Sequence, residues 1–471
     1  MVVGELIQEK ELVIIGGGPG GYTAAIRAAQ LGLKVTLIEK DQLGGVCLNK
    51  GCIPSKVYTH AAQEMDNFPH LNDLGIEVTK PTIQIDKLVE YKNRITDQLK
   101  KGVAALCKAN KIEVIEGEAT FLSQDRIGVE AGHDFQTFRF EKAIIAAGGK
   151  TVAPEGISSS DRIFISHDIF SLSEVPEHLI IQGGDVIALE MATTFHAFGS
   201  QVTVLVEEGE DFPFDAAVTK ELRRIFKKKK ITLQADCKVI QATSSGNGVT
   251  VTFQDKNGEA IMEGSHFYTT GNIAVDAAGL GIDRLGMEMT AEDRVKIDSE
   301  MKTNIPNIYA IGDLTPGPVL AVKAIKQGKV AAEILAGGTS EADLTLLPTI
   351  AHTLPPIAAV GLTEAAAQEL GYHFTTSQFP LASNGYASIL GRKDGFVKII
   401  AEEESDLILG VHMIGAGAIE LSGMMTTGLE MVARAEDFTF PNYAHPSVNE
   451  SILEAVEGLI GQAIHMAPPR K

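Results

Sequence analysis

Cysteine is scarce in this chain of 471 residues, which contains only four. A secreted scaffold held together by disulfides would contain many more, and zinc sites usually take a second pair of ligands. Cys107 and Cys237 stand alone among ordinary helix and strand residues, so neither completes such a site. The low count argues against a secreted disulfide framework and against a metal site, and it leaves Cys47 and Cys52 as the pair to explain.

The sequence also has fewer positive than negative charges, and it lacks long apolar runs. There are 41 lysines and arginines against 61 aspartates and glutamates, a net charge of -20, and tryptophan is absent. Nucleic acid and anionic membrane surfaces both require a basic face. No apolar run approaches the roughly 18 residues of a membrane helix, and residues 1–10 hold no apolar core of signal-peptide length. We therefore expect a cytoplasmic protein of roughly two to four domains that binds neither nucleic acid nor membrane.

Two cysteines five residues apart lie in the stretch 44–56, Gly-Gly-Val-Cys-Leu-Asn-Lys-Gly-Cys-Ile-Pro-Ser-Lys. In a regular helix such positions lie beyond disulfide reach and on different faces, so the backbone must bend between them. Gly51 supplies freedom for that bend, and Pro54 suits the first turn of a following helix. We interpret Cys47 and Cys52 as a redox-active pair at a helix start. The alternatives are two unconnected thiols, or a permanent disulfide that a reducing cytosol would open.

A dinucleotide-binding unit is predicted before this stretch. Its expected order is strand, glycine turn, helix and strand, over residues 12–15, 16–21, 24–31 and 34–38. Gly16 permits the tight turn, Gly18 lets a pyrophosphate approach the backbone, and Gly21 allows close helix packing. Glu39, directly after the second strand, is placed to accept hydrogen bonds from a ribose. A nucleotide site joined so closely to a dithiol indicates a flavin.

Residues 47–56 point to a family. Cys-Leu-Asn-Lys-Gly-Cys-Ile-Pro-Ser-Lys resembles the matching stretch of the flavoprotein disulfide reductases, and of the dihydrolipoyl dehydrogenases in particular. The resemblance implies an α/β fold with two Rossmann-like dinucleotide-binding domains, of FAD and NAD type, and an α+β C-terminal dimerisation domain. The expected domains are 1–150 for FAD, 151–275 for the NAD type, 276–345 as a central part that returns to FAD, and 346–471 as the interface.

Two later stretches resemble the family's returns to the flavin. In residues 142–148, Ala147 stands where the family has threonine. The second stretch is residues 304–313, and the resemblance implies that its Asp313 hydrogen-bonds the ribityl chain. A helix that opens at 320–324 is then expected to face the pyrimidine edge of the flavin, although Val322 replaces the usual histidine. The positions assigned to FAD in this way are Gly16, Gly18, Gly21, Glu39, Gly45, Lys56, Gly148, Gly312, Asp313 and Ala321.

The second dinucleotide unit begins at residues 178–190 and departs from the pattern. Gly183 opens the glycine turn and Gly184 follows, but the second and third required glycines are Asp185 and Ala188. A Cβ at the middle position blocks the diphosphate, and a carboxylate there repels it at a helix end that suits an anion. Alternatively, Asp185 is a plain N-cap for the following helix.

Two further departures affect the same unit. Its next strand ends in Val206, where an acid for the ribose hydroxyls is expected, and Glu207 and Glu208 just beyond are imperfect substitutes that disfavour NADP. Gly271 is followed by Asn272, where the family has arginine. These losses in one predicted pocket leave two hypotheses open, normal use of NAD and impaired use of NAD.

Two charged pairs complete the predicted site. In the family, the glutamate matching Glu190 pairs with the lysine matching Lys56 beside the flavin, where the lysine stabilises the charge of the reduced ring. Residues 444–450, Ala-His-Pro-Ser-Val-Asn-Glu, match the family's histidine and glutamate motif. The resemblance implies that His445 and Glu450 are a base and its orienting carboxylate, which reach the partner subunit's disulfide in an obligate homodimer. Surface charges and a structural histidine are the simpler alternatives.

The resemblance implies that a dihydrolipoyl dithiol gives a proton to His445, that its thiolate attacks Cys47, and that Cys52 leaves as a thiolate and reduces the flavin. The leading hypothesis is oxidation of a dihydrolipoamide-like dithiol, or of a lipoyl-bearing carrier protein, with NAD as acceptor. A second hypothesis keeps the fold but passes electrons to another redox protein or small acceptor. A third, a non-catalytic subunit, would have no need of these residues.

Overall fold

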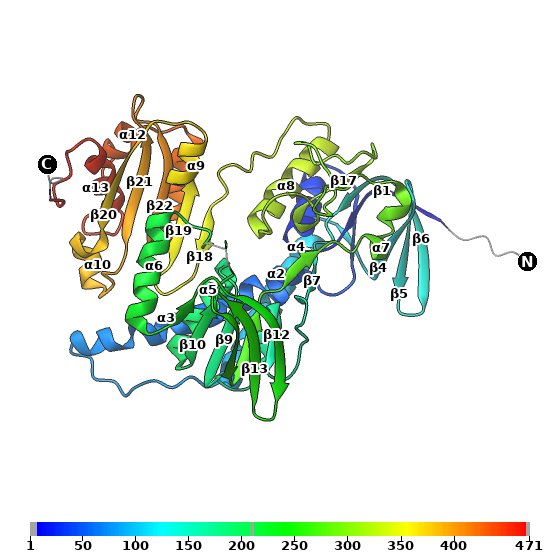
Figure 1. Ribbon diagram of the computed structural model, residues 1–471. Coiled ribbons are helices and arrows are strands. Elements are labelled where there is room, and N and C mark those ends of the chain that lie inside the picture. The colour runs from blue at the N-terminus through cyan, green and yellow to red at the C-terminus, as the bar shows by residue number, and fades with distance from the viewer. Residues whose placement is uncertain (1–6, 208, 210–211, 468–471) are drawn as a thin grey trace, which may run out of the picture. The chain divides into compact units, whose positions relative to one another are not determined.

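The computed structural model describes residues 7–207, 209 and 212–467 (Figure 1), so Glu208 lies outside the described residues. The chain divides into two compact units. The first unit comprises Met1–Ser55, Lys87–Pro154 and Gly271–Leu344, and the second comprises Lys56–Asp86, Glu155–Thr270 and Thr345–Lys471. Within the described ranges, no helix is long and apolar enough to cross a membrane. The four domains expected from the sequence stay a prediction.

A seven-stranded sheet forms the centre of the first unit. In spatial order its strands are β3 (Glu113–Glu116), β2 (Val35–Glu39), β1 (Gln8–Ile15), β6 (Asp134–Ile145), β5 (Arg126–Ala131) and β4 (Glu118–Ser123), with β17 (Ile308–Ala310) also paired to β6. β1 pairs in parallel with β2 and β6, whereas β4, β5 and β6 pair antiparallel. Along β1, Leu12 and Ile14 belong to one hydrophobic core and Val13 and Ile15 to another. This strand is therefore buried on both faces, as expected for parallel strands.

Several helices accompany this sheet in the first unit. They are α1 (Pro19–Gln30), α2 (Gly45–Asn49), α4 (Ile85–Ala109), α7 (Ala277–Leu280) and α8 (Ala321–Leu335), with the 3-10 turns η2 (Ile282–Leu285) and η3 (Gly312–Leu314) and the strand pair β7 (Lys150–Val152) and β16 (Asn272–Ala274). α3 (Cys52–Asp73) starts in the first unit and continues in the second. A Cβ on Gly328 would lie 2.6 Å from the Gly20 carbonyl oxygen, so the close approach of α1 and α8 requires glycine at position 328.

A parallel sheet and an antiparallel sheet make up the middle of the chain in the second unit. The parallel strands, in spatial order, are β11 (Thr232–Gln234), β10 (Gln201–Leu205), β9 (His178–Gln182), β15 (His266–Thr269) and β8 (Ile163–Ile165). Antiparallel strands β12 (Lys238–Ser245), β13 (Gly248–Asp255) and β14 (Gly258–Gly264) accompany η1 (Ser166–Ser171), α5 (Val186–Phe198) and α6 (Ala216–Lys229). Most residues of α5 are buried, which explains why its sequence is apolar on nearly every side.

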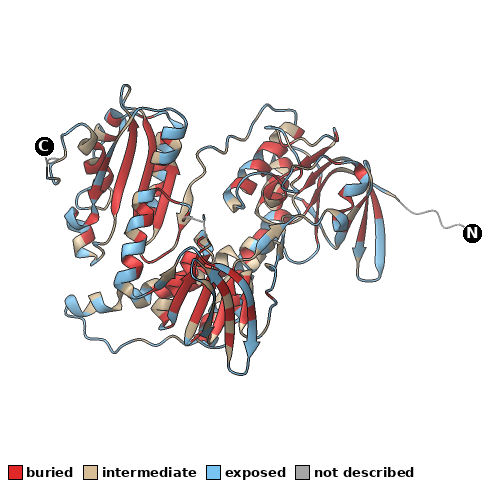
Figure 2. Cartoon of the chain, in the orientation of Figure 1, coloured by how far each residue is buried: buried red, intermediate tan, exposed pale blue. Residues whose placement is uncertain are grey.

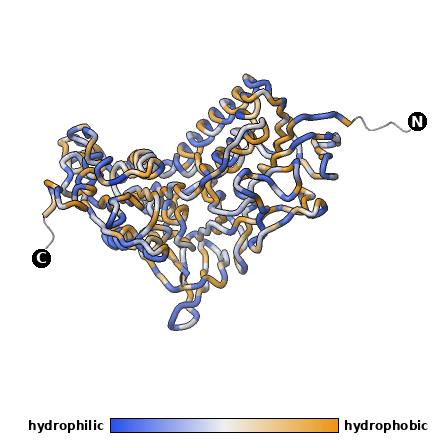
Figure 3. Tube along the Cα trace, turned by 90° about the horizontal axis from the view of Figure 1, so that it is seen from above, coloured by the Kyte–Doolittle hydropathy of each residue, from blue (hydrophilic) through white to orange (hydrophobic). Residues whose placement is uncertain are grey.

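The C-terminal part of the second unit is a five-stranded sheet with helices. The sheet order is β18 (Thr349–Ala351), β19 (Ile357–Gly361), β22 (Ile408–Ile414), β21 (Phe396–Glu402) and β20 (Phe374–Pro380), all antiparallel. The helices are α9 (Glu364–Glu369), α10 (Gly385–Ile389), α11 (Ala418–Glu430), α12 (Ala435–Thr439) and α13 (Glu450–Leu459), with η4 (Leu381–Ser383). Figure 2 shows the central strands in red as buried, and Figure 3 shows hydrophobic and hydrophilic stretches interspersed along the trace.

An ion pair is buried in this second unit. Lys398 on β21 donates to Asp215, the N-cap of α6, over 2.5 Å, and their side chains are 4% and 1% exposed. Lys398 also pairs with Glu364 at the start of α9. Asp215 further accepts the backbone N–H of Ala217 and of Glu364. Buried charges are tolerated when they are paired and hydrogen-bonded in this way.

The mixed α/β architecture predicted from the sequence is confirmed.

Candidate functional site

The two cysteines lie on either side of a sharp break between helices in the first unit. The N–H groups of Lys50 and Gly51 both donate to the Val46 carbonyl oxygen, at 2.8 and 2.7 Å, which closes α2. α3 then begins at Cys52, and both Cys47 and Cys52 are half-buried. The bend and the helix start predicted from the sequence are thus confirmed.

The segment with Cys47 is tied directly to the glycine turn. The Gly44 N–H donates to the Gly17 carbonyl oxygen over 2.8 Å. A Cβ on Gly45 would lie 2.7 Å from the Gly18 Cα, and Gly45 has φ +58°, so a larger residue does not fit. The dithiol segment and the nucleotide turn therefore form one local structure.

The turn between β1 and α1 leaves space and donors for a diphosphate. Gly16 has φ +101°, and a Cβ there would collide with the Ala146 carbonyl oxygen, while a Cβ on Gly21 would collide with the carbonyl oxygen of Gly16. The nearest heavy atom to a Cβ on Gly18 is 3.9 Å away, and no side chain caps the N-terminus of α1. An uncapped helix N-terminus with open space above a glycine is suited to a phosphate.

Glu39 supports this turn from the end of β2. Its side chain is buried, and its Oε2 accepts the Gly17 N–H over 2.6 Å while its Oε1 accepts the Asp41 N–H over 2.8 Å. Each carboxylate oxygen has a second lone pair, so a ribose hydroxyl can still be bound. The sequence predicted Glu39 as a ribose ligand but did not predict its hydrogen bond with the Gly17 N–H in the glycine turn.

Gly312 and Asp313 form the second part of the site predicted to return to the flavin. Gly312 has φ +80°, and its N–H donates to the Gln327 side-chain oxygen over 2.8 Å. Asp313 is half-buried, and burial raises the pKa of its carboxyl group despite the nearby charges of Lys323 and Arg294. No side chain caps the N-terminus of α8, whose first residue is Ala321. Gly148 has φ +69° and no neighbour that a Cβ would meet within 4 Å.

Three residues near these positions were not predicted from the sequence. Lys323 is fully buried on α8 and donates to the carbonyl oxygens of Thr315 and Pro316 at 3.1 Å, and burial lowers its pKa. Arg294 donates to the carbonyl oxygen of Asp313 over 2.9 Å. The pKa of Tyr22 is raised by burial and then by Cys47 and Cys52. A lysine in the apolar start of α8 was the one available signal, whereas Arg294 and Tyr22 follow from tertiary packing alone.

Lys56 and Glu190 are paired in the second unit. The Lys56 Nζ lies 2.9 Å from Glu190 Oε1 and 2.8 Å from Oε2. Glu190 is completely buried on α5 and also accepts the backbone N–H of His352 over 2.8 Å. Burial and then the positive charge of Lys56 lower the pKa of His352. The structure brings together the two residues that the sequence paired, and their role at a flavin stays a prediction.

His445 and Glu450 also meet. The His445 Nδ1 lies 2.8 Å from Glu450 Oε1, and Glu450 Oε2 accepts the Ser447 N–H over 2.8 Å. Burial raises the pKa of Glu450, but the hydrogen bonds from His445 and Ser447 outweigh it and lower the pKa overall. The His445 side chain is 81% exposed. Because Nδ1 faces the carboxylate, Nε2 is the ring nitrogen that is left to accept a proton, and the role of His445 as a base stays a prediction.

The second dinucleotide turn differs from the first in what covers it. Asp185 caps α5, with its Oδ1 accepting the N–H groups of Ile187 and Ala188 at 2.8 and 3.1 Å, and its Oδ2 accepts the Thr270 hydroxyl at 2.7 Å. The N-cap interpretation of Asp185 is therefore confirmed. Gly184 is buried, and a Cβ there would lie 3.3 Å from both Phe212 and Val206.

The remaining positions predicted for this turn are placed as follows. Val206 is buried directly after β10, and Glu207 is half-buried. Gly183 has φ +118°. Gly271 and Asn272 follow Thr270 in the chain and belong to the first unit, where Asn272 begins β16, so their part in this pocket stays a prediction. These residues do not fit a pyridine dinucleotide, because the middle glycine position holds a carboxylate that already binds the helix N–H groups.

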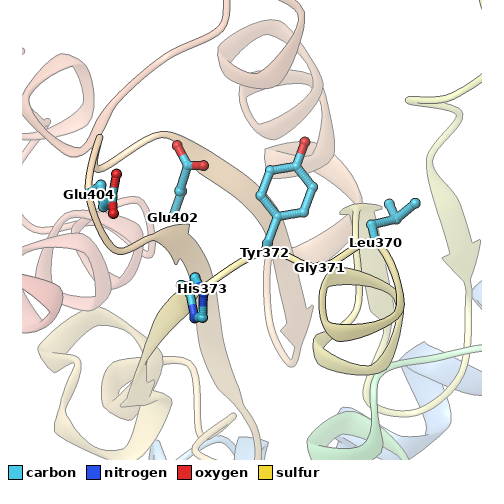
Figure 4. Close-up of a pocket in the computed structure, with 6 residues that line it drawn as sticks. All are labelled: Leu370, Gly371, Tyr372, His373, Glu402 and Glu404. Carbon is cyan, nitrogen blue, oxygen red and sulfur yellow. The ribbon is translucent and has the colours of Figure 1, made fainter.

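Two surface hollows in the described part of the chain are lined by other residues than the predicted ones. One, of about 270 Å³, is lined by residues from the loop between α9 and β20 and from the end of β21 and the turn after it, namely Leu370, Gly371, Tyr372, His373, Glu402 and Glu404 (Figure 4). Another, of about 550 Å³, includes Arg162 and His266. Neither contains a residue predicted from the sequence to be functional.

Comparison with known proteins identifies the family. Residues 10–328 match the pyridine nucleotide-disulphide oxidoreductases, and residues 347–456 match the dimerisation domain of the same family. The chain is 38% identical to the dihydrolipoyl dehydrogenase of Bacillus subtilis, over 99% of this chain and 100% of the relative. It is 36% identical to the dihydrolipoyl dehydrogenase of Halobacterium salinarum, over 99% of each.

Solved structures agree. LpdA from Mycobacterium tuberculosis matches with a TM-score of 0.88 and 25% identity, over 95% of this chain and 99% of LpdA. The HOCl-induced flavoprotein disulfide reductase RclA from Escherichia coli matches with a TM-score of 0.85 and 25% identity, over 95% of this chain and 99% of RclA. The chain therefore belongs to the pyridine nucleotide-disulphide oxidoreductase family, as the resemblance in its sequence predicted.

Proposed function

We propose that the protein is an FAD-dependent dithiol–disulfide oxidoreductase of the dihydrolipoyl dehydrogenase type, which oxidises dihydrolipoamide or a lipoyl-bearing carrier protein. The observation that carries the proposal is the joint between the dithiol and the nucleotide turn, where Gly44 donates to Gly17 and Gly45 packs on Gly18. A redox pair fixed this closely to a dinucleotide turn exchanges electrons with whatever ring that dinucleotide carries.

FAD fits the residues of the first unit. The uncapped N-terminus of α1 would hold the diphosphate, the buried carboxylate of Glu39 the ribose, and Asp313 the ribityl chain. The uncapped N-terminus of α8 suits a group that becomes negative on reduction. When bound, FAD accepts the electron pair that the dithiol delivers.

Thiol exchange supplies that electron pair. His445 takes the proton of one substrate thiol at Nε2, and Glu450 holds the ring through Nδ1 and stabilises the imidazolium that forms. The substrate thiolate attacks Cys47 in the Cys47–Cys52 disulfide, a mixed disulfide forms, and Cys52 leaves as a thiolate. The second substrate thiol then displaces Cys47, which releases the substrate as a disulfide and leaves both cysteines reduced.

Lys56 and Glu190 support the redox step. The resemblance to the family implies that the Lys56 ammonium would stabilise the negative charge of a reduced flavin, and the buried Glu190 carboxylate would offset the cost of keeping that lysine partly desolvated. His352 fixes the carboxylate through its backbone N–H. The role of the pair is thus to position charge.

The catalytic unit is a homodimer. The match of residues 347–456 to a dimerisation domain supports this state, and the exposed His445 ring is available to serve the partner subunit's dithiol. A dithiol that cycles between two redox states suits the reducing cytoplasm expected from the sequence.

A second candidate function is favoured by Asp185. In this alternative the dithiol and FAD chemistry is unchanged, but electrons leave to a redox protein or small acceptor in place of NAD. The carboxylate over the N-terminus of α5 is the specific observation in its favour, because NAD would need those N–H groups for its diphosphate.

Rapid mixing separates these functions. Dihydrolipoamide and NADH are each mixed with oxidised holoenzyme, and the flavin absorbance is followed. Bleaching by both reductants supports the NAD-linked enzyme, and bleaching by the dithiol alone supports the second candidate. Bleaching by neither overturns the proposal, as would full dithiol turnover in a Cys47→Ser variant. Cys107→Ser is the matched control, since Cys107 is a fully buried cysteine on α4 that does not belong to the predicted redox pair.

A further inference from the structure

The two strand–turn–helix units of the chain follow the same backbone path up to the helix. Gly16 after β1 has φ +101°, and Gly183 after β9 has φ +118°. The residue immediately before the helix has φ -70° in both, with ψ -176° at Gly18 and 166° at Asp185. Because the backbone conformations agree, the difference between the two turns resides in their side chains.

The first turn is open above its helix. Gly18 provides no side-chain cap for α1, and a Cβ placed there would have only the Gly45 Cα near it, at 3.9 Å. The N–H groups of the first helical turn therefore remain available to an anion.

The second turn is closed by its own carboxylate. One oxygen of Asp185 accepts the N–H groups of Ile187 and Ala188, and the other accepts the Thr270 hydroxyl, so both oxygens are fixed. Asp185 is exposed, so its charge is accessible to a ligand that approaches the N-terminus of α5. A dinucleotide diphosphate would have to displace this carboxylate, and until it did so it would face a like charge a few ångströms away.

Neighbouring side chains reinforce the closure. Phe212 and Val206, both buried, pack over Gly184. In the first turn the corresponding position after the strand is Glu39, whose carboxylate can accept from a ribose, whereas Val206 has no acceptor. Ala188 carries a methyl group where Gly21 has none.

We infer that Asp185 is an internal substitute for the diphosphate of a dinucleotide, held by Thr270, and that it determines acceptor specificity by excluding NAD⁺ and NADH from the second unit. The inference rests on the proposed function for its place in turnover, and it selects the second candidate function over the first. The first turn has the same backbone conformation and glycine at position 18, so it shows how open the second turn would be without the Asp185 side chain.

Titration calorimetry of NAD⁺ into oxidised holoenzyme tests this inference. We expect no saturable binding by the wild type up to about 1 mM, and at least about tenfold tighter binding by Asp185→Gly, since the glycine removes both the bulk and the charge. Asp185→Asn keeps the cap and the bulk without the charge, so its gain should be smaller. Glycine is itself tolerated at helix N-caps, so Asp185→Gly should fold.

Two further variants make the result decisive. Asp185→Gly combined with Val206→Glu supplies a ribose acceptor as well, in case the glycine alone is insufficient. Thr363→Gly removes the N-cap of α9 in the same unit, where Thr363 accepts the Ala366 N–H, and should leave NAD⁺ binding unchanged. The inference is overturned if the wild type binds NAD⁺ as tightly as Asp185→Gly. It is also overturned if neither Asp185→Gly nor its combination with Val206→Glu binds NAD⁺ at least tenfold more tightly than the wild type. Flavin bleaching by dihydrolipoamide, measured on the same samples, reports separately whether the proposed function holds.

Discussion

The imidazole of His445 and the carboxylate of Glu450 lie 2.8 Å apart at the start of α13. A second His–Glu pair joins Glu454, in the middle of the same helix, to His465 beyond its end. His465 Nδ1 is 2.6 Å from Glu454 Oε1. The two pairs have similar geometry, but only the first belongs to the motif that the sequence predicted to be catalytic. The chain thereby provides its own matched control.

Glu450→Gln should slow flavin reduction by dihydrolipoamide by about tenfold to a hundredfold, because the imidazolium loses the carboxylate that stabilises it. Glu454→Gln should leave the rate per folded molecule unchanged. Stopped-flow rates at pH 7 to 8 provide the measurement. The hydrogen bonds that lower the pKa of Glu450 keep it ionised in this range. Equal losses in the two variants would show that Glu450 is merely structural.

Lys398→Met should lower the free energy of unfolding by about 3 to 5 kcal/mol, because Asp215 would be left buried without its cation. Lys228→Met removes an exposed pair with Asp394 and should cost under about 1 kcal/mol. Urea unfolding followed by circular dichroism measures both variants. A Lys398→Met protein as stable as wild type would contradict the account of this buried pair.

The same ion pair predicts a pH dependence. Burial raises the pKa of Asp215, but hydrogen bonds from Lys398 and from the Ala217 and Glu364 N–H groups lower it overall. A carboxyl group with a depressed folded-state pKa contributes stability above its unfolded pKa of about 3.9 and loses that contribution as the pH falls through the folded value. The stability gap between wild type and Asp215→Asn should therefore be largest near neutral pH and shrink below about pH 4. A stability gap that widens as the pH falls would show that folding does not lower the pKa of Asp215.

Alkylation should distinguish the two kinds of cysteine in the chain. After reduction, iodoacetamide should modify the half-buried Cys47 and Cys52 within minutes, because thiolate fraction and access together set the rate. Burial raises the pKa of Cys107 and Cys237, which are both fully buried, so they should react only on unfolding. Peptide mass spectrometry reads the four sites separately, and fast labelling of Cys107 would contradict the burial seen here.

Gly45→Ala should weaken FAD binding, since the new methyl group would lie 2.7 Å from the Gly18 Cα at a residue with φ +58°. Gly102→Ala, on α4 in the same unit, has no neighbour within 4 Å and should stabilise the helix by roughly 0.5 to 1 kcal/mol. The ratio of flavin to protein absorbance after purification tests both. Full retention of flavin in Gly45→Ala would show that the dithiol segment can move away from the turn.

Local signals in the sequence predicted much of this structure. The glycine turns, the break before Cys52 and the helix start at 321 depend on residues next to one another, whose conformational preferences are set within a few positions. The Lys56–Glu190 and His445–Glu450 pairs were predicted by resemblance, because family motifs record long-range contacts that single residues do not.

Other features of the site depend on segments distant in the sequence. Thr270 reaches Asp185 because β15 lies beside β9, and Phe212 covers Gly184 from the segment before α6. Nothing in the residues near 185 specifies either neighbour. Tyr22 and Arg294 were missed for the same reason, since their partners come from other elements of the fold.

The order in which the chain is synthesised has a consequence for the first unit. Its N-terminal glycine turn packs through α1 on α8, which ends at Leu335, and its sheet gains β17 only at Ile308–Ala310. The intervening segment, Glu155–Thr270, belongs to the other unit. A ribosome must therefore complete more than two thirds of the polypeptide before the earliest motif acquires its full support. Premature termination between Glu155 and Thr270 would release a chain with the complete sequence of the glycine turn but without α8, the helix on which α1 packs.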